Sequence, residues 1–174
     1  MVASHNRITM KLVFLARSLV ASLRIAVASR NPFIPFKSNI ICKGTLLLNG
    51  RIYGLRSCHI QVEEGASLSI GSETHFSEFI QIRCSNHIEI GNHVRIAPFC
   101  ILSDSLYKDL GSSNPQIVLK KVIIEEECFV APFSFICGNV HIGKASIIGP
   151  HTNLKNQSLA AFTLLTKSKQ NVFM

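Results

Sequence analysis

A large aliphatic residue recurs at every sixth position between residues 122 and 154, and neither helix nor strand periodicity explains this spacing. The positions are Ile124, Val130, Ile136, Ile142, Ile148 and Leu154. Six residues turn an α-helix by about 600°, so a helix would spread these side chains around its surface. A coil with three short faces instead points every sixth residue at its axis and closes one turn in about 18 residues. The pattern therefore predicts a parallel β-helix made of hexapeptide repeats.

Earlier segments repeat this pattern with slightly longer turns. The stretch ASLSIGSETHF (66–76) aligns with NHIEIGNHVRI (86–96), and HIQV (59–62) aligns with FIQI (79–82). Extra residues at a corner between two faces would produce this longer repeat. We therefore expect coils from about residue 40 to residue 154, with one long excursion at 103–121.

The order of these segments resembles the left-handed β-helix acyltransferases of the hexapeptide-repeat superfamily, in particular the sugar O-acetyltransferases of polysaccharide biosynthesis. The matching elements are HIEIGNHVRIAPFCILSD, a polar loop, and VIIEEECFVAPFSFICGNVHIGKASIIG. The resemblance implies an all-β, left-handed parallel β-helix with one long loop. The handedness comes from the resemblance, because parallel crossovers are otherwise right-handed. It also implies a homotrimer with acetyl-CoA as co-substrate and a sugar or glycan as acceptor.

The resemblance implies that the loop at 103–121 carries catalytic residues. A long polar loop is seldom kept in a regular coil unless it serves a site. In the family a loop histidine takes the proton from the acceptor hydroxyl, in a pattern similar to S-D-S-D-F-H. Here residues 103–108 read SDSLYK, so Lys108 stands where histidine is expected. We expect Asp104 and Lys108 in the catalytic site, and His93, at a corner of the preceding coil, as the alternative base.

Small residues on the last coils match the positions that bind coenzyme A in the family. They are Ala131, Gly138, Ala145, Ser146 and Gly149, and Lys167 is expected to meet the phosphates. Small residues also suit tight corners for steric reasons alone, so both interpretations stay open.

The composition suits one compact domain, since 47% of the 174 residues are hydrophobic. The six cysteines include no C-x-x-C pair, and we expect buried, reduced thiols in a cytoplasmic protein. We predict no metal site, because His75 aligns with Arg95 and not with another histidine, so no stack of ligands forms.

The net charge of +8 comes from the N-terminal part of the chain. Nine Lys or Arg and no acid lie up to Val62, which leaves 18 − 9 = 9 bases and 10 acids for the remainder. We divide the chain into a segment at 1–39 and a β-helix domain at 40–174. In the first segment, the pattern from Ile8 to Ser29 predicts a basic amphipathic helix. Its three cations interrupt the apolar residues, so no apolar run reaches the ~18 residues that a membrane span needs.

This helix has two compatible interpretations: it caps the open end of the coil, or it lies at the inner face of a membrane beside anionic headgroups. Nucleic acid is not expected as a partner, because the basic residues are not interleaved with aromatic residues and no binding motif is present.

Two functions remain open on these grounds. We favour an acetyl-CoA-dependent O-acetyltransferase acting on a sugar hydroxyl in surface polysaccharide or lipopolysaccharide biosynthesis. The alternative is a non-catalytic β-helix that binds a glycan or a partner enzyme, because the expected catalytic histidine is Lys108.

Overall fold

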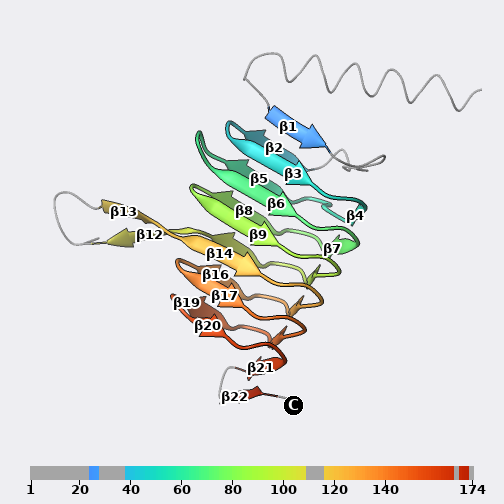
Figure 1. Cartoon of the computed structure of the whole chain (residues 1–174), viewed down its shortest axis with the longest axis vertical. Coiled ribbons are helices and arrows are strands. Elements are labelled where there is room, and N and C mark those ends of the chain that lie inside the picture. Colours follow the sequence, from blue (N-terminus) through green and yellow to red (C-terminus); the bar gives the residue numbers. More distant parts are fainter. Residues whose placement is uncertain (1–23, 28–37, 109–115, 167–168, 173–174) are drawn as a thin grey trace, which may run out of the picture.

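The computed structural model describes residues 24–27, 38–108, 116–166 and 169–172, which form a parallel β-helix with three flat faces. Each turn of the chain places one strand on face 1, one on face 2 and one on face 3. In Figure 1 the near strands, which belong to face 2, run from left to right while the chain descends from β2 to β21. That sense of rotation is left-handed, so the predicted all-β, left-handed β-helix is confirmed.

The strands of each face lie parallel and in chain order. Face 1 contains β2 (Asn39–Cys42), β5 (His59–Val62), β8 (Gln81–Cys84), β11 (Ile101–Ser103), β16 (Phe135–Cys137) and β19 (Asn153–Lys155). Face 2 contains β1 (Arg24–Val27), β3 (Thr45–Leu48), β6 (Ser67–Ile70), β9 (His87–Ile90), β14 (Lys121–Ile124), β17 (Val140–Ile142) and β20 (Ser158–Leu159). Face 3 contains β4 (Ile52–Tyr53), β7 (Thr74–Phe76), β10 (Arg95–Ile96), β15 (Phe129–Val130), β18 (Ile147–Ile148) and β21 (Thr163–Thr166), with β22 (Lys169–Val172) antiparallel at its end.

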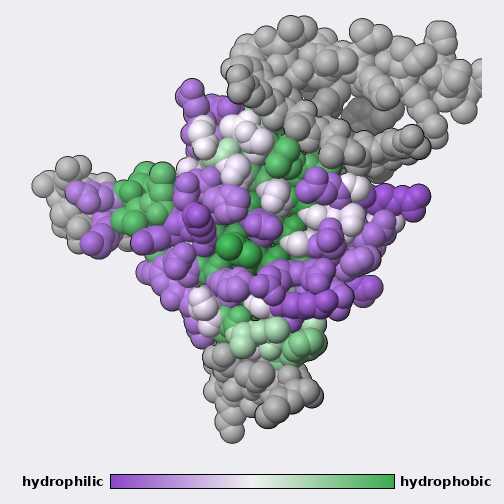
Figure 2. All heavy atoms as spheres, viewed as in Figure 1, coloured by the Kyte–Doolittle hydropathy of each residue, from purple (hydrophilic) through white to green (hydrophobic). Residues whose placement is uncertain are grey.

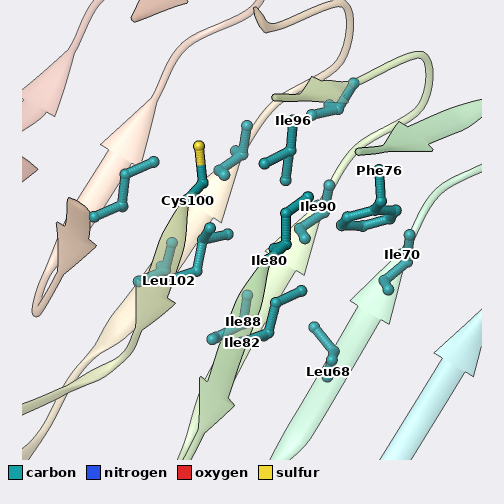
Figure 3. Close-up of a cluster of buried hydrophobic side chains, with 14 of the residues drawn as sticks. Leu68, Ile70, Phe76, Ile80, Ile82, Ile88, Ile90, Ile96, Cys100 and Leu102 are labelled. Carbon is teal, nitrogen blue, oxygen red and sulfur yellow. The ribbon is translucent and has the colours of Figure 1, made fainter. Parts of the chain in front are cut away.

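Aliphatic side chains from all three faces fill the axis of the coil. Strand side chains alternate between inside and outside, and the alternation is seen in β3, β5, β6, β8 and β9, where every second residue is buried. Figure 3 shows these stacks, for example Leu68 beside Ile88 and Ile70 beside Ile90. The stacking predicted for the later turns is confirmed, because Val122 pairs with Val140 and Ile124 with Ile142.

The length of the turn varies at one corner. From face 3 to face 1 the chain always takes six residues, as from His75 to Gln81 and from Phe129 to Phe135. At the corner from face 1 to face 2, by contrast, two residues lie between Cys84 and His87 but four lie between Val62 and Ser67. We call this the variable corner.

The long version of the variable corner corrects one predicted alignment. HIQV (59–62) pairs with QIRC (81–84) and not with FIQI (79–82). The alignment of 66–76 with 86–96 is confirmed. The two additional residues fall between Val62 and Ser67, where a sequence comparison has no inward aliphatic residue to fix the register.

The predicted ends of the coil also change. Most of the helix expected from Ile8 to Ser29 lies outside the described residues, but the prediction is wrong for Arg24–Val27, which form β1 and pair in parallel with β3. At the other end the coil continues past residue 154 through β20 and β21. The last turn is one residue shorter than the turn before it, since His141 pairs with Ser158, and this hides the six-residue period. In the described ranges no helix is long and apolar enough to cross a membrane.

All six cysteines are buried and unpaired, as expected for small core residues. Burial raises the pKa of their thiols, to about 12 at Cys84, where the charge of Asp104 adds to the effect, and to about 11 at Cys128. The thiols are therefore protonated and unreactive near neutral pH.

Candidate functional site

The excursion at the variable corner is an antiparallel hairpin that projects from the side of the coil (Figure 1). Its strands are β12 (Ser105–Lys108) and β13 (Gln116–Leu119). The side chains of Ile117 and Leu119 are 57% and 51% exposed. Figure 2 shows green, apolar residues on this arm, at the left, beside purple, hydrophilic ones. A hairpin with exposed apolar side chains is a surface that a partner would cover.

The hairpin is anchored by the fully buried carboxylate of Asp104. One carboxylate oxygen accepts a hydrogen bond from the backbone N–H of Ser85 at 2.8 Å, and the other accepts one from the N–H of Asn86 at 2.7 Å. The main chain also closes the base of the hairpin, because the N–H of Lys120 donates a hydrogen bond to the Asp104 carbonyl at 2.7 Å. The Asn86 side chain also donates to the Lys120 carbonyl at 2.8 Å. Asp104 thus ties the entry and exit of the hairpin to the turn before it, and its carboxylate is not open to a substrate.

Gly138 lies at the same base of the hairpin. Its φ is +81°, and a Cβ at this position would lie 2.6 Å from Cδ1 of Leu106 in the hairpin. Its N–H donates to the Ser103 carbonyl at 2.9 Å. A side chain here would be strained by the positive φ and would collide with the side chains of Leu106 and Asn156, so packing alone accounts for this glycine.

The other two predicted catalytic residues lie at different corners of the protomer. Lys108 is exposed on β12 and pairs with Gln116 at the variable corner. His93 is exposed at the corner from face 2 to face 3, where it adopts a φ of +56° and its N–H donates to the Ser72 carbonyl. The structure therefore does not bring Asp104, Lys108 and His93 into one site within a single chain.

Two of the predicted cofactor positions do share a feature. Ala131 and Gly149 belong to a row of small residues on face 3, which also contains Ser77 and Ala97; each N–H in the row donates to the strand of the next turn. An open hollow of about 380 Å³ lies beside this row, and its lining is His75, Ser77, Arg95, Ile96, Ala97 and Phe129. The small side chains form the floor, because larger ones would fill the space.

Aromatic and cationic side chains form the raised wall of the hollow. His75, Arg95 and Phe129 point outward from β7, β10 and β15 in adjacent register. The His75 ring stacks on Tyr53 with centroids 4.4 Å apart. Among the described residues no carboxylate forms an ion pair with Arg95, so its guanidinium is available to an anion.

An aromatic ladder runs along the corner from face 3 to face 1. Phe79, Phe99, Phe133 and His151 each adopt a φ near +60° and stack with ring centroids 5.0–5.1 Å apart. The three phenylalanines are about half exposed. A bulky residue with positive φ is strained, so the ladder maintains an exposed apolar edge at a conformational cost.

Face 2 carries two histidine pairs that the sequence pattern did not single out. His87 Nδ1 lies 2.7 Å from Ser67 Oγ, one turn before the hairpin. His141 Nε2 lies 2.8 Å from a Glu125 oxygen. The hydrogen bonds from His141 and from the Lys144 N–H lower the pKa of the Glu125 carboxyl. The alignment of 66–76 with 86–96 could have revealed the first pair, because it places Ser67 and His87 in one column.

The remaining predicted cofactor residues lie elsewhere. Ala145 and Ser146 occupy the corner from face 2 to face 3, where the buried Ser146 hydroxyl donates to the Ala160 carbonyl and accepts from the Thr163 N–H. That hydroxyl is therefore occupied by the fold. Lys167 lies outside the described residues. Across the described ranges no three His, Cys, Asp or Glu side chains gather as a metal site.

Residues 121–156 match the family described as bacterial transferase hexapeptide (six repeats). This part of the coil therefore matches the hexapeptide repeat found in bacterial transferases. The match begins at β14, directly after the hairpin, and the repeat continues through β19. The predicted resemblance to the hexapeptide-repeat acyltransferases is thereby confirmed. A search of curated proteins finds no match.

Solved structures share the fold over nearly the whole chain. AntD, an N-acyltransferase from Bacillus cereus in complex with dTDP and 3-hydroxybutyryl-CoA, superposes with a TM-score of 0.76 at 17% identity, over 94% of this chain and 85% of AntD. A variant of AntD in complex with dTDP-4-amino-4,6-dideoxyglucose and coenzyme A gives 0.70 at 16% identity, over 90% and 82%. At this identity the likeness establishes the fold of the hexapeptide-repeat chain.

Replacing Asp104 tests its role as the anchor of the hairpin. We expect Asp104→Asn to lower the free energy of unfolding by about 1.5–3 kcal/mol, because an amide offers one acceptor oxygen to two backbone N–H groups. Chemical denaturation measures this change, and hydrogen exchange should show faster exchange at the Ser85 and Asn86 amides. Glu64→Gln, an exposed substitution two turns earlier at the same corner, is the matched control. Equal stability of the two variants would contradict the anchoring role.

Proposed function

We propose that the protein transfers an acyl group from a coenzyme A thioester to a sugar. The observation that carries this proposal is the hexapeptide repeat of the transferase type, entered directly from the hairpin at the variable corner. The shared fold with AntD supports it, since AntD binds an acyl-CoA and a dTDP-sugar. The row of small residues on face 3 offers a path along which a thin, extended thioester arm could lie.

The favoured reaction is O-acetylation of a sugar hydroxyl in surface polysaccharide or lipopolysaccharide biosynthesis, with acetyl-CoA as the donor. The acceptor oxygen forms a bond to the acetyl carbon, the carbon–sulfur bond breaks, and the hydroxyl proton passes through a base to the leaving thiolate. In the hairpin, Lys108 takes the place of that base. Imidazole is the side chain suited to exchanging a proton near neutral pH, so a lysine at this position is the poorer general base.

N-acylation of an amino sugar is the second candidate, and the same lysine favours it. A neutral sugar amine attacks with its own lone pair, so it depends less on a base than a hydroxyl does. AntD, the matched fold, is an N-acyltransferase crystallised with an amino sugar nucleotide. The acceptor therefore distinguishes the two reactions, and a chain that binds acyl-CoA but acylates neither would be the non-catalytic β-helix.

The proposed assembly is a homotrimer in which the hairpin of one subunit rests on the next. The exposed side chains of Ile117 and Leu119 and the aromatic ladder are two apolar surfaces at different corners of one protomer. Contacts between unlike surfaces generate closed rings when the rotation closes. Such a ring would carry Lys108 to the surface of the neighbouring subunit.

We also propose a cytoplasmic location with peripheral contact at the inner face of the membrane. The segment from Ile8 to Ser29 is apolar and basic, and anionic headgroups attract such segments. The buried, protonated thiols suit a reducing compartment.

Acyl transfer and its base are tested together. With acetyl-CoA and a set of hydroxyl and amino sugars, we expect release of the coenzyme A thiol only when an acceptor sugar is present. Lys108→His should raise O-acetylation near neutral pH at least about tenfold, since a positioned base contributes roughly 10²–10⁴ in rate. Lys120→His, at the exit of the same hairpin, is the control. If Lys108→His changes nothing while His93→Ala abolishes transfer, the base lies on the coil and not on the hairpin.

The trimer is tested by light scattering of the full chain at micromolar concentration. We expect three-fold mass for the wild type and dissociation when Ile117 and Leu119 are both replaced by Ser, because the apolar contact is lost. Replacing the exposed Ile41 of β2 by Ser is the control. A monomeric wild-type protein would overturn the proposed assembly.

Membrane contact is tested by sedimentation with vesicles. We expect the protein to sediment with anionic vesicles at low salt and to be released as salt screens the basic residues. Equal recovery with neutral and anionic vesicles would leave only the capping role for the N-terminal segment.

A further inference from the structure

We propose that the hollow on face 3 binds a nucleoside diphosphate, with Arg95 holding the phosphates and Phe129 supporting the base. This inference rests on the proposed function, since both an acyl-CoA and a nucleotide sugar carry such a group, and it names the residues that would recognise it. The arrangement of the outward side chains on the adjacent strands β7, β10 and β15 supports this proposal.

Arg95 is placed between two aromatic side chains by the strand register. It pairs with His75 on one side and with Phe129 on the other, and neighbouring strands lie about 4.8 Å apart. The three outward side chains therefore form one continuous ridge. Tyr53 stacks on the His75 ring at one end of the ridge, whereas Phe129, which pairs with Ile147 on its other side, is 38% exposed.

The charge of Arg95 is not neutralised by its surroundings. Glu73, at the corner before β7, accepts a hydrogen bond from the Tyr53 hydroxyl at 2.9 Å. In the part of the chain that the structure describes, no acid forms an ion pair with Arg95. A guanidinium presents a planar set of donors that matches a phosphate in two-point contact, which makes an anion with at least two oxygens its natural ligand.

The floor of the hollow leaves room for that anion. Ser77 and Ala97 stand two residues further along the chain than His75 and Arg95, and their small side chains place the surface below the ridge. Ser77 also brings a hydroxyl to the lining of the hollow. The hollow is open to solvent, and its volume of about 380 Å³ falls within the roughly 300–1,000 Å³ typical of small-molecule sites.

The continuation of the floor suggests how a longer ligand would extend. Ala131 and Gly149 follow Ser77 and Ala97 in the same row, toward the end of the coil. A nucleotide held at Arg95 would therefore direct its remaining arm along this row. The arm would be the pantetheine chain of an acyl-CoA or the sugar of a nucleotide sugar.

Calorimetry on the full chain tests the site with four probes: dTDP, ADP, coenzyme A and inorganic pyrophosphate. We expect Arg95→Gln to weaken binding of the nucleoside diphosphates at least about tenfold, because charge-assisted hydrogen bonds are lost. Phe129→Ala should weaken dTDP and ADP but leave pyrophosphate unchanged, since only the base contacts the ring. Arg83→Gln is the matched control, because Arg83 is also exposed but lies on face 1.

The probes also identify the source of the nucleotide. Loss of coenzyme A affinity in Arg95→Gln, with dTDP unchanged, assigns the hollow to the acyl donor, and the reverse result assigns it to the sugar nucleotide. Wild-type affinity of Arg95→Gln for every probe would overturn the proposal. If Arg95→Gln loses nucleotide binding but the wild type acylates no sugar, the site stands and the proposed function fails. If the wild type is active and Arg95→Gln keeps its KM values, the function stands and the site fails.

Discussion

Stacking of aliphatic side chains along the axis is the constraint on which the rest of this structure depends. Each inward residue must lie over its equivalent in the next turn, as Ile70 lies over Ile90 and Ile90 over Ile124. A turn of the wrong length would move polar residues into the core, where an unpaired polar group is costly. Additional residues are therefore accommodated at a corner and not within a face. The variable corner takes nearly all of them, and the hairpin is its largest insertion.

The same stacking organises the outer surface in columns. Residues about one turn apart become neighbours, so His75, Arg95 and Phe129 form a ridge although they are far apart along the chain. The aromatic ladder arises in the same way at a corner. A surface site on this coil is therefore formed by residues at equivalent positions of successive turns. A substitution at one of these outward positions changes one member of the column and leaves the core unchanged.

A buried carboxylate lets the regular coil carry an irregular arm. The hairpin interrupts the main chain between Ser103 and Lys121, yet β14 resumes in register on β9. Asp104 makes this possible because it satisfies two backbone N–H groups of the preceding turn while the Lys120 N–H closes the loop on its carbonyl. Gly138 leaves the space into which Leu106 packs. Asp104, which the sequence comparison placed in a catalytic motif, thus anchors the hairpin that carries Lys108.

The sequence by itself determined a parallel β-helix with three faces, because each six-residue aliphatic repeat indicates it locally; the left-handed sense does not follow from the period. It also predicted the position of the excursion and the burial of the cysteines. Where the period is broken, at 62–67 and after residue 154, the predicted register was wrong or ended too early, since no inward residue marks the corner. Only the tertiary structure decided the surface: Asp104 is an anchor, Lys108 and His93 lie at different corners, and Arg95 stands open in a hollow beside Ala131. These positions depend on which residues of successive turns lie side by side. That register is fixed by the lengths of the corners and not by the six-residue repeat.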